Sequence, residues 1–275
     1  MAIDCKAIAK EIKDECRDYL SSLNKSYYLK IIQVAGDDAS NAYTRGKKKD
    51  CEEIGLNCQH VLLPNNSNFV NVYVEIMQAN DDPDCCGIIL QLPLPDHLKD
   101  DAEKLTNCIY PEKDVDGFLA NSPFNPCTPE GILYIMKHQL GNNLAGKTVL
   151  IVGRGKLVGK PLAQMLDKEN MTIIQANSYT PRAQLAQLML FVDTVITATG
   201  MADTVDAKMG LWLRDETVVI DAGINRDENG KMCGDCNPAI ANTHDKITTV
   251  PGGVGLMTRA MLMKNCIESI KQMEN

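Results

Sequence analysis

Apolar runs that alternate with helix-like segments constrain the fold of this chain more than any other feature. In the first third, compact apolar runs at 29–36, 59–64 and 85–95 are separated by segments of helical spacing at 42–54 and 68–81. This order is typical of a parallel sheet, because a parallel connection needs a crossover that is long enough to hold a helix. We therefore expect an α/β fold in which helices cover a parallel sheet.

A second alternation indicates a second domain. A stretch rich in Pro, Asp and Asn at 96–127 interrupts the pattern, and a helix is predicted to follow over 128–140. Further strands are expected at 147–153, 171–176, 193–200 and 216–223, with 246–251 as an additional candidate. Helical spacing also predicts helices near both ends, over 3–23 and 256–273. Because 275 residues are many for one core, we expect domains of residues 1–120 and 121–255.

Composition excludes several classes of partner. The net charge of −8 argues against nucleic acid, and the cluster Lys47–Lys49 is too short to follow a phosphate backbone. An anionic ligand must therefore be met by local cations. No stretch approaches the roughly 20 apolar residues of a membrane span, and the N-terminal stretch is charged throughout. Eleven cysteines without framework spacing are read as reduced thiols of a cytoplasmic protein.

A glycine-rich turn joins the predicted strand at 147–153 to a helix. The sequence "VLIVGRGKLVGKPLAQML" places Gly153, Gly155 and Gly159 in that turn. Such turns let backbone amides and a helix N-terminus approach a dinucleotide pyrophosphate. The G-x-G-x-x-x-G spacing is one residue longer than the usual fingerprint, so a second interpretation stays open, in which the glycines serve only close packing of helix on sheet.

The end of the next predicted strand bears on the choice of dinucleotide. An NAD site usually places an acid about 20 residues beyond the glycine turn, where it binds the ribose hydroxyls. Here Ala176, Asn177, Ser178 and Tyr179 occupy that region, and none of them is acidic. Arg154 and Ser178 could instead bind a 2′-phosphate, so the sequence favours NADP.

A short cationic segment in the first domain has two interpretations. "SNAYTRGKKKDCEEIG" sets Tyr43 ahead of Arg45, Lys47, Lys48 and Lys49 on a predicted helix. Charge runs usually lie on solvated helix faces. Alternatively, one lysine takes part in chemistry, and an (i, i+4) spacing would put Tyr43 and Lys47 on one face, where both could contact the same ligand.

Several motifs together resemble one family. "YTRGK", "LQLPLP", "PEKDVDGF", "PCTPEGI", "GKTVLIVGRGKLVGKPLA" and "PGGVGLMTRAML" occur in the order found in methylenetetrahydrofolate dehydrogenase/cyclohydrolase, over about residues 3–270. The resemblance implies an N-terminal three-layer α/β domain that is completed by the C-terminal helix, about 256–275. It also implies a Rossmann-type NADP-binding domain, with the active site in the cleft between the two domains.

The resemblance further implies two reactions of one-carbon metabolism, in the branch that feeds purine biosynthesis. In the first, 5,10-methylenetetrahydrofolate loses a hydride to NADP and becomes 5,10-methenyltetrahydrofolate. In the second, that cation is hydrolysed to 10-formyltetrahydrofolate. A folate is therefore the expected small-molecule substrate, and the family also implies a homodimer formed through the second domain.

The family motifs select four catalytic candidates: Tyr43, Lys47, Gln91 and Asp116. Lys47 matches the lysine that assists attack of water by proton transfer, a task that requires its amine to be neutral part of the time. Tyr43 would stack on the aminobenzoyl ring, and Gln91 would hydrogen-bond the lysine. Asp116 would bind the pterin through two hydrogen bonds, whereas Asp114 is the more structural member of the acidic pair.

The resemblance also implies binding residues around these groups. The folate site would include Tyr43, Leu90, Gln91, Leu92, Asp116, Pro251, Gly252, Gly253, Val254 and Gly255. The cofactor site would include Gly153, Arg154, Gly155, Ser178 and Ile224. No metal is expected.

This chain departs from the family pattern at three positions. Gly155 stands where a serine is usual, Asn177 where a histidine is usual and Leu256 where a proline is usual. The missing serine hydroxyl puts one phosphate contact in doubt. None of the three changes removes a catalytic group.

Two other questions stay open from sequence alone. Cys233 and Cys236 form a CxxC pair, which could be half a zinc site, a redox pair or a coincidence in a cysteine-rich chain. A dehydrogenase that has lost hydrolysis, or a folate- or nucleotide-binding regulator without turnover, would share the same scaffold. The presence of Lys47 and Gln91 argues against both.

Overall fold

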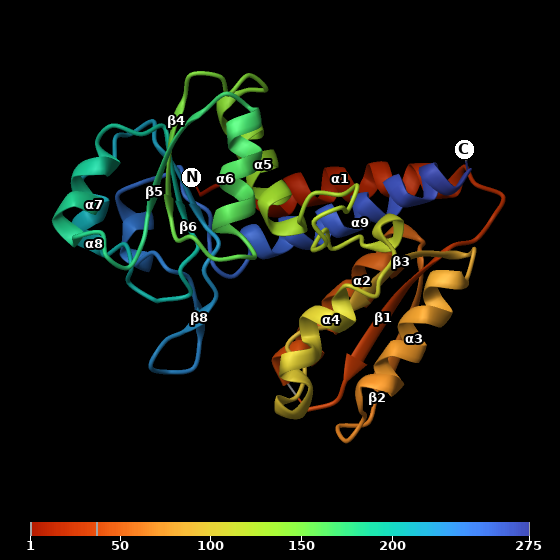
Figure 1. Cartoon of the computed structure of the whole chain (residues 1–275). Helices are drawn as coiled ribbons and strands as arrows, with labels where there is room; N and C mark the ends of the chain where they lie inside the picture. Colours follow the sequence, from red (N-terminus) through yellow and green to blue (C-terminus); the bar gives the residue numbers. More distant parts are fainter. Residues whose placement is uncertain (1, 37, 275) are drawn as a thin grey trace. The chain divides into compact units, whose positions relative to one another are not determined.

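The computed structural model describes residues 2–36 and 38–274 of the chain. It contains two compact units, one formed by Met1–Ala9 with Thr128–Thr258 and the other by Lys10–Cys127 with Arg259–Asn275 (Figure 1). Each contains a parallel sheet, so the predicted α/β class with two domains is confirmed. The boundary expected after residue 120 stays a prediction.

The unit around Lys10–Cys127 is built on a three-stranded parallel sheet of order β2-β1-β3. The strands are β1 (Tyr28–Val34), β2 (Asn57–Leu63) and β3 (Cys85–Leu90), joined by the predicted helices α2 (Asp38–Ile54) and α3 (Phe69–Asp81). The connection from β1 to β2 runs toward one edge of the sheet, and the connection from β2 to β3 runs back past β1 toward the other edge. Because both crossovers are right-handed, they place α2 and α3 on opposite faces of the sheet. The result is the expected three-layer arrangement.

The central strand explains why this sheet forms. All seven residues of β1 are buried, as a strand covered on both faces requires. Ile32 and Val34 pack with Val72 and Ile76 of α3 in one apolar core. The helix α2 ends at Ile54, and Gly55 follows with φ of +82°, the left-handed conformation of a C′ glycine.

The third strand is shorter than the apolar run that predicted it. β3 ends at Leu90, not at residue 95, because Pro93 and Pro95 have no amide hydrogen for a sheet ladder. The chain continues through short helices η1 (Asp96–Asp101), α4 (Ala102–Thr106) and η2 (Pro111–Lys113). The carboxyl end of β3 therefore leads directly into a loop.

The other unit contains a four-stranded parallel sheet of order β5-β4-β6-β7. Its strands are β4 (Thr148–Val152), β5 (Thr172–Ala176), β6 (Thr194–Thr197) and β7 (Val218–Asp221). Its helices are α5 (Cys127–Leu140), α6 (Gly159–Lys168), α7 (Arg182–Met189) and α8 (Ala207–Gly210). Leu150 and Val152 of β4 pack with α7 and α8 in one core, as a strand buried on both faces should.

One predicted strand of this unit was wrong. Residues 246–251 form only an isolated bridge between Ile247 and Val219. The amide of Val219 donates to the carbonyl of Lys246, and the carbonyl of Val219 accepts from the amide of Thr248. The next amide in the pattern, that of Asp221, donates to the side-chain hydroxyl of Thr248 instead of a backbone carbonyl, so the pairing does not continue. A small antiparallel pair, β8 (Asn225–Arg226) with β9 (Met232–Cys233), flanks the turn-like sequence "DENGK", and η3 (Pro238–Asn242) follows.

Two long helices complete the chain, α1 (Cys5–Ser21) and α9 (Val254–Glu274). From Arg259 onward α9 belongs to the three-stranded unit, where Met263 and Cys266 are fully buried. The sulfur of Met263 lies 3.9 Å from that of Cys51 in α2. None of the described helices has the length and apolar character that a membrane span needs.

Candidate active site

Lys47 and Gln91 meet at the carboxyl end of the three-stranded sheet. Lys47 extends from α2 and is only 9% exposed, and its Nζ donates to Oε1 of Gln91 at 3.3 Å. The other end of the amide is also fixed, because Nε2 of Gln91 donates to the carbonyl of Leu92 at 2.7 Å. The glutamine amide therefore presents its oxygen, not its NH2 group, to the lysine.

Asp116 is the third polar group at this point. Its Oδ2 lies 3.9 Å from Nζ of Lys47, a longer approach than the contact with Gln91. The Asp116 side chain keeps 16% of its surface exposed, so part of the carboxylate remains free to accept hydrogen bonds from a ligand. The amine thus lies between a neutral acceptor and a carboxylate.

The loop that carries Asp116 is held by a buried lysine that the sequence interpretation missed. Nζ of Lys113 donates to the carbonyls of Ala79, Asn80 and Asp82 at 2.8, 2.7 and 2.6 Å. These carbonyls lie at the C-terminal end of α3, where helix carbonyls lack intrahelical partners. The ammonium group of Lys113 therefore caps the C-terminal end of α3 and at the same time anchors the "PEKDVDGF" loop to it.

A second support for this loop comes from the last helix. Asn265 of α9 donates from Nδ2 to the carbonyl of Val115 at 2.9 Å, directly before Asp116. Val115 also packs on Gly87 of β3, where an added Cβ would lie 2.6 Å from its methyl group. Asp114 is fully buried and accepts the amide of Leu119 at 2.8 Å, and burial raises the pKa of its carboxyl group.

Tyr43 lies one helical turn before Lys47, on the same side of α2. Its side chain is half-buried, and burial raises the pKa of its phenol. The guanidinium of Arg259 in α9 is the charge that acts on this phenol. Arg259 was not identified from the sequence, although it stands within the quoted motif "PGGVGLMTRAML". Of the other cations in the segment, Lys49 is exposed and Lys48 is half-buried.

The two leucines beside Gln91 differ in position. Leu90 is a buried member of the apolar core, so its side chain faces the interior, not the sheet edge. Leu92 is half-buried, and its carbonyl accepts from Gln91 and from the hydroxyl of Ser40. Their predicted contacts with a folate remain predictions.

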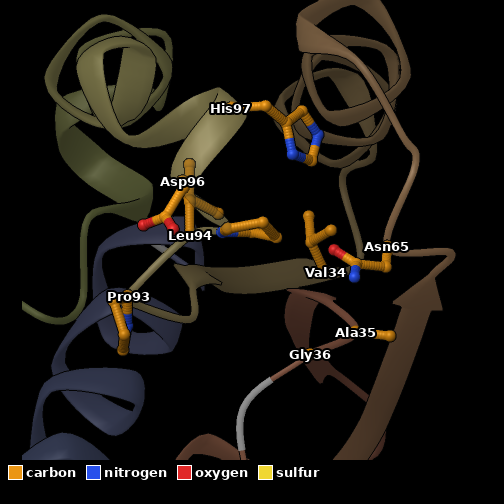
Figure 2. A pocket seen from close by; sticks show the side chains of 9 residues that line it. Val34, Ala35, Gly36, Asn65, Pro93, Leu94, Asp96 and His97 are labelled. Carbon is orange, nitrogen blue, oxygen red and sulfur yellow. The ribbon is translucent and has the colours of Figure 1, made fainter.

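A cavity of about 420 Å³ lies at the carboxyl ends of β1 and β3 (Figure 2). It is lined by Val34, Ala35, Gly36, Asn65, Pro93, Leu94, Pro95, Asp96 and His97. The imidazole of His97 is fixed by a contact of 2.9 Å between Nε2 and the carbonyl of Ser67. In α/β sheets, ligands bind outside the carboxyl ends of strands where the strand order reverses, and β1 and β3 flank that point here.

In the four-stranded unit, the glycine turn follows β4 as predicted. Gly153 has φ of +120°, and an added Cβ would overlap the carbonyl of Ala198. A Cβ at Gly159, the first residue of α6, would overlap the carbonyl of Gly153. A Cβ at Gly155 would meet nothing within 4 Å. Close packing therefore requires two of the three glycines, and Gly155 leaves open space at the turn.

The other predicted cofactor residues lie at the same edge of this sheet. Arg154 is exposed in the turn, Ser178 is exposed just beyond β5, and Ile224 is 51% exposed just beyond β7. Val152 pairs with Ala176 in the parallel ladder, so the turn and Ser178 follow neighbouring strand ends. Gln175, which the sequence interpretation missed, donates to the carbonyl of Gly159 at 3.2 Å and braces the turn.

A buried carboxylate shapes the loop after β6. Asp235 is fully buried and accepts the amides of Thr199, Gly200 and Met201 at 2.6, 3.3 and 3.1 Å. Its own amide donates to Asp221 at the end of β7. Both acids lie at the carboxyl edge of the sheet, and no spacing in the sequence had indicated their pairing.

The CxxC pair lies in the same segment as Asp235. Cys236 is buried and its amide donates to Asp221, while Cys233 is half-buried in β9. All eleven cysteines are free thiols. Within residues 2–36 and 38–274, no three His, Cys, Asp or Glu side chains gather as a metal site would require.

The segment Pro251–Gly255 belongs to the unit with the four-stranded sheet. Gly252 has φ of +103°, and a Cβ at Gly253 would overlap the carbonyl of Thr249. Val254 is buried and begins α9, whereas a Cβ at Gly255 would meet nothing within 4 Å. The backbone therefore favours glycine at positions 252 and 253, and the predicted role of the segment at the folate remains a prediction.

Comparisons with known proteins agree over the whole chain. The catalytic domain of tetrahydrofolate dehydrogenase/cyclohydrolase matches residues 3–116, and its NAD(P)-binding domain matches residues 126–274. The bifunctional protein FolD of Agathobacter rectalis is 38% identical, over 98% of this chain and 99% of that protein.

Solved structures give the same result. The bifunctional methylenetetrahydrofolate dehydrogenase/cyclohydrolase FolD of Campylobacter jejuni superposes with a TM-score of 0.89 at 34% identity, covering 99% of both chains. The Trypanosoma brucei enzyme, complexed with NADP and an inhibitor, superposes with a TM-score of 0.87 at 30% identity, covering 99% of this chain and 97% of that one. The chain therefore belongs to the tetrahydrofolate dehydrogenase/cyclohydrolase family.

Proposed function

We propose that this protein oxidises 5,10-methylenetetrahydrofolate to 5,10-methenyltetrahydrofolate with NADP and hydrolyses the product to 10-formyltetrahydrofolate. The observation that carries the proposal is the amine of Lys47 held against the amide oxygen of Gln91, with Asp116 at 3.9 Å. This arrangement supplies a positioned base and a pterin acceptor. It is the constellation that the family motifs select.

Lys47 has the position that a proton-transfer group needs. In the hydrolysis, water attacks the methenyl carbon and must lose a proton as the new carbon–oxygen bond forms. Gln91 orients the amine without the full negative charge that would hold it as an ammonium ion. When the folate is bound, Asp116 accepts from the 2-amino group and the neighbouring ring N–H of the pterin, which places the reacting carbon.

The oxidation requires no acid or base from these side chains. The hydride leaves with its own electron pair, so no base is required in that step, and the residues of the site bind and orient the folate. The four-stranded unit fits a dinucleotide, because the open space at Gly155 and the amides at the start of α6 suit a pyrophosphate. NADP supplies the hydride acceptor.

Arg154 and Ser178 support NADP over NAD. Both are exposed beyond neighbouring strand ends, and the end of β5 carries no acid that would bind a ribose 2′-hydroxyl. Arg154→Ala should weaken NADP by about tenfold to a hundredfold and leave NAD nearly unchanged, as expected for one charge-assisted phosphate contact. Equal use of NAD and NADP by the wild-type protein would contradict this assignment.

The decisive test of the reaction uses purified protein and both steps. Loss of the methenyl absorbance reports hydrolysis, and formation of NADPH from methylenetetrahydrofolate reports oxidation. Lys47→Met should reduce hydrolysis by about 10²–10⁴-fold and affect oxidation less. Lys49→Met, which changes an exposed neighbour, is the matched control and should leave both rates near wild type.

A dehydrogenase without hydrolase activity is the second candidate function. It would show NADPH formation with no loss of methenyl absorbance in the wild-type protein. The buried contact of Lys47 with Gln91 favours the bifunctional enzyme, because a dehydrogenase has no need of a lysine in this position. A binding protein without turnover would show neither signal.

Assembly and location complete the proposal. We expect a homodimer formed through the four-stranded unit, supported by the family resemblance. Sedimentation of a single species near the chain mass of 30.2 kDa at micromolar concentration would contradict it. The cytoplasm is the proposed location, supported by eleven free thiols, which persist in a reducing compartment.

A further inference from the structure

Arg259 of α9 packs on Gly46 of α2, the helix that carries Lys47. A Cβ added at Gly46 would overlap Nη1 of Arg259, so the guanidinium packs directly on the backbone of α2. Gly46 immediately precedes Lys47, and it shares a helix face with Tyr43 three residues earlier. Any larger residue at position 46 would displace the arginine from this helix.

A buried carboxylate fixes the arginine in this position. Nε of Arg259 lies 3.0 Å from Oδ2 of Asp50, as an ion pair and not as an aligned hydrogen bond. Asp50 is 3% exposed, and its other oxygen accepts from Lys13 at 3.3 Å. Burial raises the pKa of Asp50, because a buried carboxylate loses its hydration. The positive charges of Arg259 and Lys13 offset this cost.

Part of the Arg259 side chain is exposed and can reach a ligand. Its Nη groups carry four of the five N–H donors of an arginine. Among the described residues, Asp50 is the acidic partner of Arg259, and the side chain keeps a quarter of its surface exposed. It is also the cation that acts on the phenol of Tyr43. A fixed, partly exposed guanidinium therefore packs on α2 one helical turn from Tyr43, the residue proposed to stack on the aminobenzoyl ring.

We propose that Arg259 binds a carboxylate of the glutamate that follows the aminobenzoyl ring of the folate substrate. The inference rests on the proposed function. A folate carries this dianionic glutamate on the far side of the ring from the pterin, and the protein has a net charge of −8. Such a group needs a local cation, and an arginine matches a carboxylate through two parallel hydrogen bonds.

A purely structural arginine is the competing explanation. In that case Arg259 would only neutralise Asp50 and hold α9 against α2. Loss of Arg259 would then impair every substrate alike, because the whole site would be disturbed. The two explanations differ for a substrate that has the pterin and the ring but no glutamate.

The test compares methylenetetrahydrofolate with methylenetetrahydropteroate, which lacks the glutamate, on one preparation of each protein. In the wild type, the glutamate should lower KM about tenfold or more. Arg259→Met should remove this preference by raising KM for the folate alone, and Arg259→Lys should restore part of it. Gly46→Ala, which displaces the guanidinium without removing it, should also reduce the preference.

The matched control is Arg45→Met, which removes an exposed cation from the same helix and should keep the preference. Because both substrates are measured on the same sample, partial loss of folded protein cancels in the ratio. An equal loss of kcat/KM for folate and pteroate in the Arg259 variants would overturn the proposal. A wild-type protein that oxidises neither substrate would instead refute the proposed function.

Discussion

Gln91 binds Lys47 through its amide oxygen while its amide nitrogen is held by the carbonyl of Leu92. The side chain therefore cannot rotate its NH2 group toward the lysine without losing a hydrogen bond of 2.7 Å. An uncharged acceptor in a fixed orientation therefore positions the amine at 3.3 Å, while the carboxylate of Asp116 lies farther away, at 3.9 Å.

Replacing this neutral acceptor with an acid should suppress hydrolysis. In Gln91→Glu, a carboxylate next to Lys47 would hold the amine in its charged form, and we expect at least a tenfold loss of hydrolysis at neutral pH. The measurement is the pH dependence of methenyltetrahydrofolate hydrolysis, whose rise should move to higher pH in the variant. An unchanged profile would show that Gln91 does not act through the protonation of Lys47.

Lys113 should contribute to stability although it does not contact the reacting groups. Lys113→Met would leave three carbonyls at the end of α3 without their buried donor, at a cost of about 1–3 kcal/mol in the free energy of unfolding. Urea denaturation measures this loss. Lys104→Met, which removes an exposed pair with Asp101, is the control and should change stability by less than about 1 kcal/mol.

Cys58 should react before the buried thiols of Cys16 and Cys85. Its pKa is lowered because the thiol of Cys51 hydrogen-bonds its thiolate and Lys48 lies nearby. Burial raises the pKa of Cys16 and Cys85 to about 11, so these thiols stay protonated at neutral pH. Alkylation at pH 7 followed by peptide mass spectrometry should label Cys58 before the other two. Earlier labelling of Cys16 or Cys85 would contradict the prediction.

His60 should make stability depend on pH. Burial and the charge of Lys48 lower its pKa below the usual 6.5 in the folded protein. The unfolded chain therefore binds the proton more tightly, and stability should fall as the pH decreases below about 6.5 toward the folded pKa. His60→Gln should flatten this part of the curve of unfolding free energy against pH. A variant that keeps the wild-type slope would assign the effect to another group.

Periodicity was enough to predict most of the fold, because most strands of the two parallel sheets are compact apolar runs. It failed at residues 246–251, where a similar run makes a single bridge to Val219. The run "KITTVP" is indistinguishable in composition from a short edge strand. Whether it pairs depends on a side chain, Thr248, that binds the amide of Asp221 and ends the ladder.

The site could be predicted only where a motif named it. Tyr43, Lys47, Gln91 and Asp116 were selected by family motifs, and the structure brings Lys47, Gln91 and Asp116 together. The supports of the site could not be predicted in the same way. Lys113 acts on carbonyls more than 30 residues earlier, and such pairings leave no periodic trace in a sequence.

The contacts of α9 have a consequence for how this protein is made. Asn265 holds the loop of Asp116 from 150 positions further along the chain, and Arg259 reaches back to Asp50 in the same way. During synthesis, the sheet and the helices α2 and α3 of the three-stranded unit emerge from the ribosome long before Asn265 and Arg259 do. The nascent first half must therefore wait on the ribosome with its catalytic loop held by Lys113 but not yet by Asn265, and the site is complete only when the last helix has been made.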